Sequence, residues 1–265
     1  MHESVIRAIS GTVYILILVA SIFYSETTFK SVFLALMVIA CFELKKILKL
    51  PLINTIIISA LSLGVGLFLP NSVLTYAIIC VPFLIYLTIL LFKQINFVYN
   101  NTLQKTIYTI GYVVLPFLSI IQLIYNENTY LPQIVLGYLI LIWTNDTFAY
   151  ICGKLLGKNK LFEKISPKKT IEGFIGGLVF SVITSFILSH FIENISLFQW
   201  ILSAIFISVF GTIGDLIESK FKRQAGIKDS GKLIPGHGGI LDRLDSFIFV
   251  APFLLLIKNL ILYVS

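Results

Sequence analysis

The chain is poor in charged residues. Only 12% of its 265 residues are Asp, Glu, Lys or Arg, whereas 57% are hydrophobic, and the mean hydropathy is +0.96. Soluble domains carry about 25% charged residues. A soluble core of this size could not bury so many apolar side chains, so the composition excludes a water-soluble protein and predicts an integral membrane protein. No soluble domain is expected at either end.

Paired cysteines are absent as well. The chain has three cysteines, Cys41, Cys80 and Cys152, and each lies alone in an apolar stretch. Without a CxxC pair, they are expected to be small hydrophobic residues within helices rather than disulfides or metal ligands.

Long apolar segments are what the sequence does contain. A bilayer core about 30 Å thick requires around 20 apolar residues per helix. The pattern therefore predicts an all-α, polytopic fold with about nine transmembrane helices. These lie at residues 7–24, 31–48, 52–69, 73–92, 104–125, 131–151, 172–192, 198–217 and 244–263. Only a few residues around Pro70 and Asn71 separate the third from the fourth, which leaves a count of eight to ten. The first segment is not expected to be a cleaved signal, because no small-residue cleavage site precedes a soluble mature domain.

The basic residues predict an orientation. If the N-terminus is cytoplasmic and there are nine spans, 18 of the 20 Lys and Arg residues fall on the cytoplasmic side, and only Lys30 and Lys258 fall outside. Cytoplasmic loops of membrane proteins carry such an excess. We expect a cell (inner or plasma) membrane protein with its C-terminus outside. The net charge of +7 then faces anionic lipid headgroups, and nucleic acid is not expected as a partner.

Acidic residues inside or beside membrane spans are costly and indicate function. At the end of the eighth span, four polar residues share one helical face, because they are spaced i, i+3, i+4 and i+7. They are Asp215, Glu218, Ser219 and Lys222. A simple pair between Asp215 and Lys222 would be a weak exposed contact, so the pattern favours a ligand role for Asp215.

A glycine-rich loop follows, and its composition rules out a regular helix between about 225 and 239. Such a loop can turn several backbone N–H groups toward an anion, and Lys228, Lys232 and Arg243 surround it with positive charge. Asp242 and Asp245 then open the last span. Helix capping would explain either one alone, but not both beside Asp215. Carboxylate oxygens next to phosphate-binding groups indicate Mg²⁺.

Two further features complete the candidate site. The segment Ser166-Pro167-Lys168-Lys169-Thr170 offers two hydroxyls and two ammonium groups just before the seventh span, and Thr170 either caps that span or binds phosphate. Asp146 lies more than one helical turn inside the sixth span. His237 is a candidate general base or zinc ligand, but a lone histidine without partner ligands argues against zinc.

The region from Ser219 to Asp245, SKFKRQAGIKDSGKLIPGHGGILDRLD, resembles the signature of the phosphatidate cytidylyltransferases, the CDP-diacylglycerol synthases. The matching positions are Ser219, Lys222, Arg223, Lys228, Asp229, His237, Gly238, Gly239, Asp242, Arg243 and Asp245. The upstream SPKKTIEG and the Asn145-Asp146 pair also resemble that family. The resemblance covers essentially the whole chain, although the apolar spans themselves are unspecific.

The resemblance implies the reaction of CTP with phosphatidic acid to give CDP-diacylglycerol and pyrophosphate, in phospholipid biosynthesis. It implies that Asp215 and Asp242 hold Mg²⁺, with Asp146 and Asp245 in support. Phosphates of CTP or lipid would be bound by Lys222, Arg223, Lys228 and Arg243, with Ser166, Lys168, Lys169 and Thr170 as the opposite wall. Ser219, Asp229, Gly238 and Gly239 are expected to help bind substrate, and His237 to position groups or shape the backbone. A potassium ion beside the magnesium and a homodimer are implied by the resemblance alone.

Other membrane enzymes and a transporter are the alternatives to a phosphatidate cytidylyltransferase. A related polyprenol or lipid kinase, or another CTP-using lipid transferase, shares much of this chemistry. CDP-alcohol phosphotransferases begin with DGxxAR, which the run from Asp242 to Asp245 does not supply. An anion transporter is disfavoured, because its polar groups would lie near the membrane midplane in paired, broken spans. We therefore expect a transmembrane scaffold in residues 1–130 and a catalytic region with two cytoplasmic loops in residues 131–265.

Overall fold

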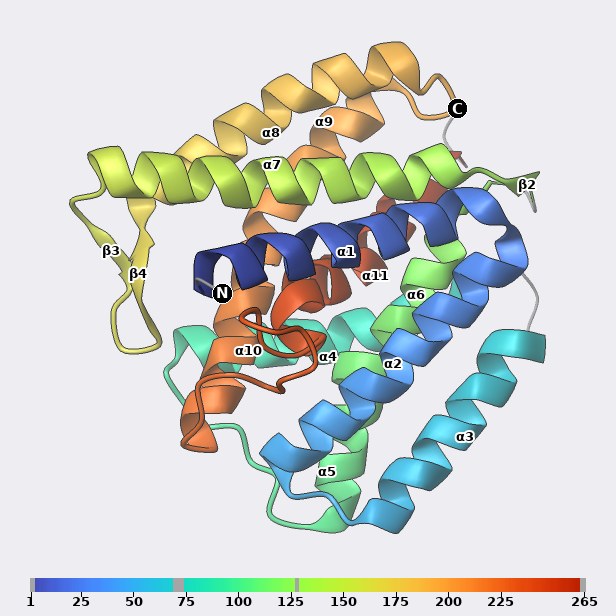
Figure 1. Ribbon diagram of the computed structural model, residues 1–265, viewed down its shortest axis with the longest axis vertical. Coiled ribbons are helices and arrows are strands. Elements are labelled where there is room, and N and C mark those ends of the chain that lie inside the picture. The colour runs from blue at the N-terminus through green and yellow to red at the C-terminus, as the bar shows by residue number, and fades with distance from the viewer. Residues whose placement is uncertain (1–2, 69–73, 127–128, 263–265) are drawn as a thin grey trace.

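The computed structural model describes residues 3–68, 74–126 and 129–262, and it is mostly helical (Figure 1). Helices lie in every predicted membrane segment. The first half contains α1 (Glu3–Tyr24), α2 (Glu26–Leu48), α3 (Leu52–Phe68), α4 (Thr75–Phe92), α5 (Thr102–Thr109), the π-helical turn η1 (Ile110–Val114) and α6 (Leu115–Leu123). The second half contains α7 (Pro132–Leu156), α8 (Ile171–Phe191), α9 (Leu197–Phe206), the π-helical turn η2 (Ile207–Gly211), α10 (Thr212–Gln224) and α11 (Leu241–Leu262). The predicted boundary around Pro70 and Asn71 lies outside the described residues, as do the ends of three predicted spans at residues 69, 73 and 263.

Six helical segments of the described chain are long and apolar enough to cross a membrane. They are Val5–Tyr24, Thr75–Phe92, Thr102–Leu123, Pro132–Leu156, Ile171–Phe191 and Leu197–Gln224. Helix α3 is apolar but has only 17 residues. The structure thus agrees with a helical, polytopic membrane protein, while the count of nine spans stays a prediction.

Two small antiparallel hairpins interrupt the helices. One pairs β1 (Tyr125–Asn126) with β2 (Thr129–Tyr130), and the other pairs β3 (Lys160–Phe162) with β4 (Ser166–Thr170). The segment expected as a loop before the seventh span is therefore strand β4. Its pairing of Thr170 with Lys160 brings that strand back to the bundle at the start of α8.

Helix α11 lies in the core, packed against α4, α6 and α10. Its side chains Phe249 and Leu254 are fully buried. Helix α10 approaches α11 very closely at Gly214, where an added Cβ would lie 2.4 Å from the Cβ of Phe249. This close approach packs the first turn of α10, which carries Asp215, against Asp245 and Phe249 of α11.

Two of the lysines in the charge tally are buried. The ammonium of Lys220 donates to the carbonyl oxygens of Leu90, at 2.9 Å, and Ile95, at 2.5 Å. Lys258 donates to the carbonyl of Leu123 at 3.1 Å. Carbonyls at a helix C-terminus lack partners within the helix, and cations are favourable there. These two lysines therefore hold the ends of α4 and α6 and are not surface charges.

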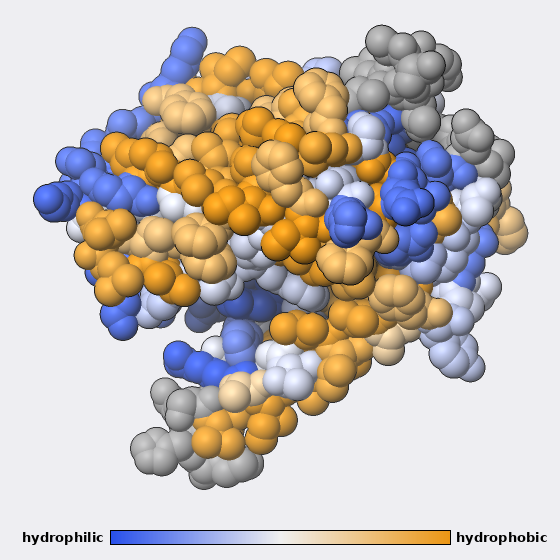
Figure 2. All heavy atoms as spheres, turned by 90° about the horizontal axis from the view of Figure 1, so that it is seen from above, coloured by the Kyte–Doolittle hydropathy of each residue, from blue (hydrophilic) through white to orange (hydrophobic). Residues whose placement is uncertain are grey.

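Several helix ends meet at one end of the bundle. The first turn of α1, the last turns of α7 and α10 and the first turns of α8 and α11 lie there, together with the β3–β4 hairpin and the loop 225–240 (Figure 1). The surface of the molecule shows a recess with hydrophilic atoms inside, between strongly apolar faces (Figure 2). Polar chemistry is therefore concentrated where these helix ends converge.

Candidate active site

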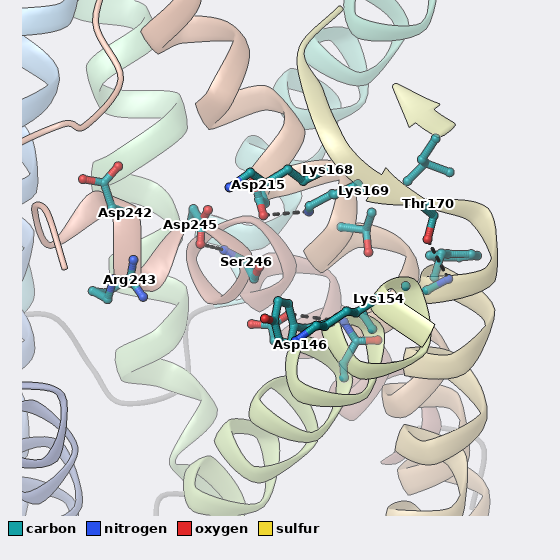
Figure 3. Close-up of a pocket in the computed structure, with 18 residues that line it drawn as sticks. Asp146, Lys154, Lys168, Lys169, Thr170, Asp215, Asp242, Arg243, Asp245 and Ser246 are labelled. Carbon is teal, nitrogen blue, oxygen red and sulfur yellow. Dashed lines mark hydrogen bonds and ion pairs between the residues drawn. The ribbon is translucent and has the colours of Figure 1, made fainter. Parts of the chain in front are cut away.

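A cavity of about 450 Å³ lies among α7, α8, α10, α11 and the β3–β4 hairpin (Figure 3). Four carboxylates line it, and we call it the carboxylate cavity. They belong to Asp146, Asp215, Asp242 and Asp245. The cations in the lining are Lys154, Lys168, Lys169 and Arg243, and its apolar wall includes Ala149, Tyr150, Leu161 and Phe174. All four predicted metal ligands are thus among the residues that line one cavity.

Asp215 is positioned by α10 and paired with the hairpin. Its Oδ2 lies 2.6 Å from the ammonium of Lys169 (Figure 3). Its Oδ1 accepts a hydrogen bond of 3.2 Å from Ser219. Lys169 is on β4, so this ion pair joins the hairpin to α10 across the cavity. Ser219 does not line the cavity; it orients the carboxylate from one turn below.

Asp245 and Asp146 are less well satisfied. Asp245 accepts a 2.8 Å hydrogen bond from the backbone N–H of Ser246, and Asp146 accepts one of 3.4 Å from the side chain of Asn145. The carboxylates of Asp146, Asp215 and Asp245 repel one another electrostatically, and Lys169 attracts them. All three carboxylates share the ammonium of Lys169, and this crowding of acidic groups favours a further cation in the cavity.

Asp242 differs from the other three, because its oxygens are already occupied. Its Oδ1 accepts a 2.6 Å bond from Lys222. Its Oδ2 accepts bonds of 2.9 Å from both the N–H and the hydroxyl of Ser230, and one of 2.8 Å from the N–H of Gly239. Asp242 therefore ties the glycine-rich loop to the start of α11.

Lys222 was predicted to bind phosphate, and in this structure it joins two carboxylates. Besides Asp242, it forms an ion pair with the buried Glu218 one turn earlier on α10. The shared helical face of Asp215, Glu218, Ser219 and Lys222 is confirmed as two local pairs, Ser219 with Asp215 and Lys222 with Glu218. Asp215 is paired with Lys169 instead of Lys222.

The hairpin supplies part of the predicted opposite wall. Lys168, Lys169 and Thr170 line the carboxylate cavity, whereas Ser166 pairs with Phe162 at the far end of the hairpin and does not. The Oγ1 of Thr170 accepts the N–H of Gly173 at 3.1 Å, so it is the N-cap of α8. Of the two roles left open for Thr170, the structure shows the cap, and the hydroxyl still faces the cavity.

The glycine-rich loop surrounds a second cavity of about 460 Å³, which we call the loop cavity. Its lining includes five of the residues predicted to bind substrate, namely Lys228, Asp229, His237, Gly238 and Arg243. The Nε of Arg243 donates to the carbonyl of His237 at 3.0 Å. Two other predicted residues lie in neither cavity lining. Arg223 is exposed, with a 3.4 Å bond to the carbonyl of Ile227, and Gly239 is buried against Ser230.

Burial lowers the pKa of His237 below its ordinary value of 6.5, with a further contribution from Arg243 and Arg7. The imidazole is therefore neutral at pH 7. Its Nδ1 lies 3.0 Å from the hydroxyl of Ser10, on α1. A ring held in this way fits the predicted positioning role.

Glu43, on α2, is a residue of the site that the sequence motifs do not predict. Its carboxylate is buried and accepts bonds from the N–H groups of Ile240, at 3.0 Å, and Leu241, at 2.9 Å, and from the hydroxyl of Ser230, at 3.1 Å. It thereby caps α11 and holds the loop from below. The signal was present in the sequence: Glu43 is an acidic residue within an apolar span, ALMVIACFEL.

The donor set of the carboxylate cavity fits Mg²⁺, which is usually bound by one or two carboxylates together with substrate phosphate oxygens. Within the described residues, no group of three or more His, Cys, Asp or Glu is arranged to hold a metal ion by itself. Lysine ammonium groups lie 2.6 Å from both Asp215 and Asp242, so a cation already stands beside each predicted ligand. Substrate oxygens would have to complete the coordination of a metal there.

Comparisons with known proteins point in the same direction. The chain is 53% identical over 121 residues to the phosphatidate cytidylyltransferase of Staphylococcus haemolyticus (strain JCSC1435). The aligned residues make up 45% of this chain and 46% of that protein. The chain is 47% identical over 147 residues to the phosphatidate cytidylyltransferase of Staphylococcus saprophyticus, covering 55% of each, and 52% identical over 122 residues to that of Staphylococcus aureus (strain COL), covering 45% of this chain and 46% of that protein. The chain spans about half the length of the curated relatives it matches.

A family model covers much more of the chain. The model described as the cytidylyltransferase family matches residues 5–261, and so includes both cavities, the hairpin and Glu43. On this evidence, the chain belongs to the cytidylyltransferase family.

Proposed function

We propose that the chain is a phosphatidate cytidylyltransferase, which converts CTP and phosphatidic acid to CDP-diacylglycerol and pyrophosphate in phospholipid biosynthesis. The carboxylate cavity carries this proposal. It gathers aspartates and lysines at the polar end of a membrane bundle, beside a wall of apolar side chains. The cytidylyltransferase family and the names of the relatives support it.

The reaction requires charge and position more than covalent chemistry. An oxygen of the lipid phosphate attacks the α-phosphorus of CTP. The bond between that phosphorus and the oxygen leading to the β-phosphate breaks, and pyrophosphate leaves with the bonding electrons. A phosphate monoester oxygen is already a competent nucleophile near neutral pH. No general base is therefore assigned, and His237 keeps a positioning role.

The residues of the carboxylate cavity divide this work. Lys168 and Lys169 bind the lipid phosphate from β4, and Arg243 binds phosphate from α11. Asp215 and Asp242 would hold Mg²⁺, with Asp146 and Asp245 in support, and when bound the ion supplies positive charge to the phosphates. Lys222 holds the side chains of Asp242 and Glu218 in place. A potassium ion remains a proposal from the family resemblance.

We place this end of the bundle in the cytoplasm, with nine spans, the N-terminus inside and the C-terminus outside. The segments that the charge pattern assigns to one side support this orientation, because the start of α1, the β3–β4 hairpin and the loop 225–240 lie at the same end of the bundle (Figure 1). Membrane lipids are the surrounding partners. A homodimer is proposed from the family resemblance alone.

The proposal is tested by incorporation of labelled CTP into chloroform-soluble lipid by the purified protein, with phosphatidic acid and Mg²⁺ supplied or withheld. We expect CDP-lipid and pyrophosphate in equal amounts, and only when both are supplied. A lipid or polyprenol kinase would transfer the γ-phosphate and release CDP instead. A transporter would form no product. Absence of CDP-lipid under every metal condition would exclude the proposed activity.

A further inference from the structure

The loop cavity is separate from the carboxylate cavity, where the lipid phosphate is expected, but the two cavities adjoin. Arg243 lines both cavities. Its position at the start of α11 places a guanidinium between the carboxylate cavity and the loop 228–238. Two spaces of about 450 and 460 Å³ therefore meet at one cation.

The loop cavity is built in part by α1, a helix assigned to the scaffold. The hydroxyl of Ser10 lies 2.8 Å from the carbonyl oxygen of Pro235 and 3.0 Å from the Nδ1 of His237. Gly236 has φ +75°, and a Cβ at this position would lie 2.6 Å from the Cγ of Arg7. The loop is thus shaped to receive the stem of Arg7, which lines the cavity.

The charge of the loop cavity is strongly positive. Arg7, Lys228, Lys232 and Arg243 face it, and Asp229 is the acidic residue in the lining. Neutral His237 adds no charge but offers a ring nitrogen. The apolar side chains in the lining are Ile234 and Pro235, so this cavity has no wall comparable to the one that Tyr150 and Phe174 form in the carboxylate cavity. It therefore suits a small, multiply charged anion better than an acyl chain.

We propose that the loop cavity binds the β- and γ-phosphates of the nucleotide, and that the carboxylate cavity receives the lipid phosphate, with Arg243 between them. Arg7 of α1 is then a substrate-binding residue. This inference rests on the proposed function, because it assigns the two substrates of that reaction to two places. It also gives the leaving group a site of its own, since pyrophosphate is formed where its charge is already neutralised.

Direct binding tests the inference without any reaction. The probe is inorganic pyrophosphate, titrated calorimetrically into the purified full chain in nanodiscs of neutral lipid. We expect the double variant Arg7→Ala/Lys232→Ala to bind pyrophosphate at least tenfold more weakly than the unchanged chain. Both side chains are exposed, and thermal unfolding checks that the double variant keeps its fold.

The matched control removes the same amount of charge elsewhere. Lys46 and Lys93 are exposed and line neither cavity, so Lys46→Ala/Lys93→Ala should keep the affinity within about twofold. Equal weakening in both double variants would show that only the overall charge matters, and would overturn the inference. So would unchanged affinity in Arg7→Ala/Lys232→Ala.

Steady-state kinetics show which of the two substrates the loop cavity binds. The Arg7→Ala/Lys232→Ala variant should raise the KM for CTP at least tenfold and leave the KM for phosphatidic acid unchanged. A rise in the KM for phosphatidic acid alone would assign the cavity to a lipid headgroup and overturn the inference. Failure of the proposed function looks different: the chain would bind pyrophosphate through Arg7 and Lys232 and yet form no CDP-lipid.

Discussion

The carboxylate cavity and the base of the glycine-rich loop both depend on acidic side chains, but they use them in opposite ways. At the base of the loop, Asp242 and Glu43 accept several short bonds each, mostly from backbone N–H groups. In the cavity, Asp215, Asp245 and Asp146 face one another and share one lysine. A satisfied carboxylate fixes the shape of the chain, whereas an unsatisfied one attracts a ligand. Acidic residues a few positions apart in one motif therefore have different effects when they are removed.

The largest effect is expected for Asp215→Asn. Loss of this charge should reduce kcat/KM roughly a thousandfold, because several kcal/mol of charge stabilisation at the phosphates is lost. Stability should change little, since the partly exposed ion pair with Lys169 that is lost is weak and the substitution relieves repulsion by Asp245 and Asp146. Labelled CDP-lipid formation and thermal unfolding measure the two quantities, and Glu193→Gln, at an exposed carboxylate that lines neither cavity, is the control expected to retain activity within severalfold. Near-normal activity of Asp215→Asn would place the metal site elsewhere.

Asp242→Asn should reduce activity as strongly as Asp215→Asn but should also destabilise the protein. The amide removes one of the two carboxylates that Lys222 faces, and it cannot accept all the bonds from Ser230 and Gly239, at about 1–3 kcal/mol for each buried donor left unpaired. The comparison of interest is the difference in melting temperature between the two variants. If Asp215→Asn destabilised the protein as much as Asp242→Asn, the distinction between unsatisfied and satisfied carboxylates would fail.

Glu43→Ala is expected to reduce activity by roughly 10–100-fold, as loss of a supporting contact around a site does. The backbone N–H groups of Ile240 and Leu241 would lose their acceptor, at about 1–3 kcal/mol each, so the start of α11 should loosen. Glu43→Gln keeps one acceptor oxygen and should recover part of both losses. Hydrogen exchange at residues 239–242 would report the loosening directly. Unchanged exchange together with lost activity would instead indicate a direct contact of Glu43 with substrate.

Lys220→Met tests a charge that serves structure alone. The carbonyls of Leu90 and Ile95 would lose their donor, and stability should fall by about 1–3 kcal/mol. Below the melting temperature, kcat and both KM values should remain those of the unchanged chain. A selective rise in the KM for CTP would mean that Lys220 reaches substrate after all.

The smallest effect concerns pH and His237. Because the folded chain holds the pKa of this imidazole below 6.5, the unfolded chain binds a proton more readily, and stability falls as the pH drops through 6.5. Above that pH the contribution is constant. The melting temperature should therefore decrease slightly more between pH 8 and pH 6 for the unchanged chain than for His237→Gln. If the melting temperature depended on pH identically in the two proteins, His237 would not contribute to the pH dependence of stability.

Much of the fold was predictable, because apolar runs and helical spacing are local properties. The helices occur where the runs predicted them, the loop 225–239 is irregular, and the four aspartates share a cavity. The pairing partners were not predictable. Asp215 joins Lys169 from a distant hairpin, and Glu43 reaches α11 from α2. Such contacts depend on how closely helices approach, as at Gly214 and Phe249, and periodicity along one segment does not contain that information.

Helix α1 also links the loop to the thickness of the bilayer. It has 22 residues, which corresponds to about 33 Å at 1.5 Å per residue, and little of its apolar surface is covered by the rest of the chain. A helix longer than the local hydrocarbon core tilts to remain within it. Since Ser10 fastens α1 to Pro235 and His237, a change in tilt would pull directly on the loop. Lipid composition would then set the shape of the loop cavity without any ligand binding to it.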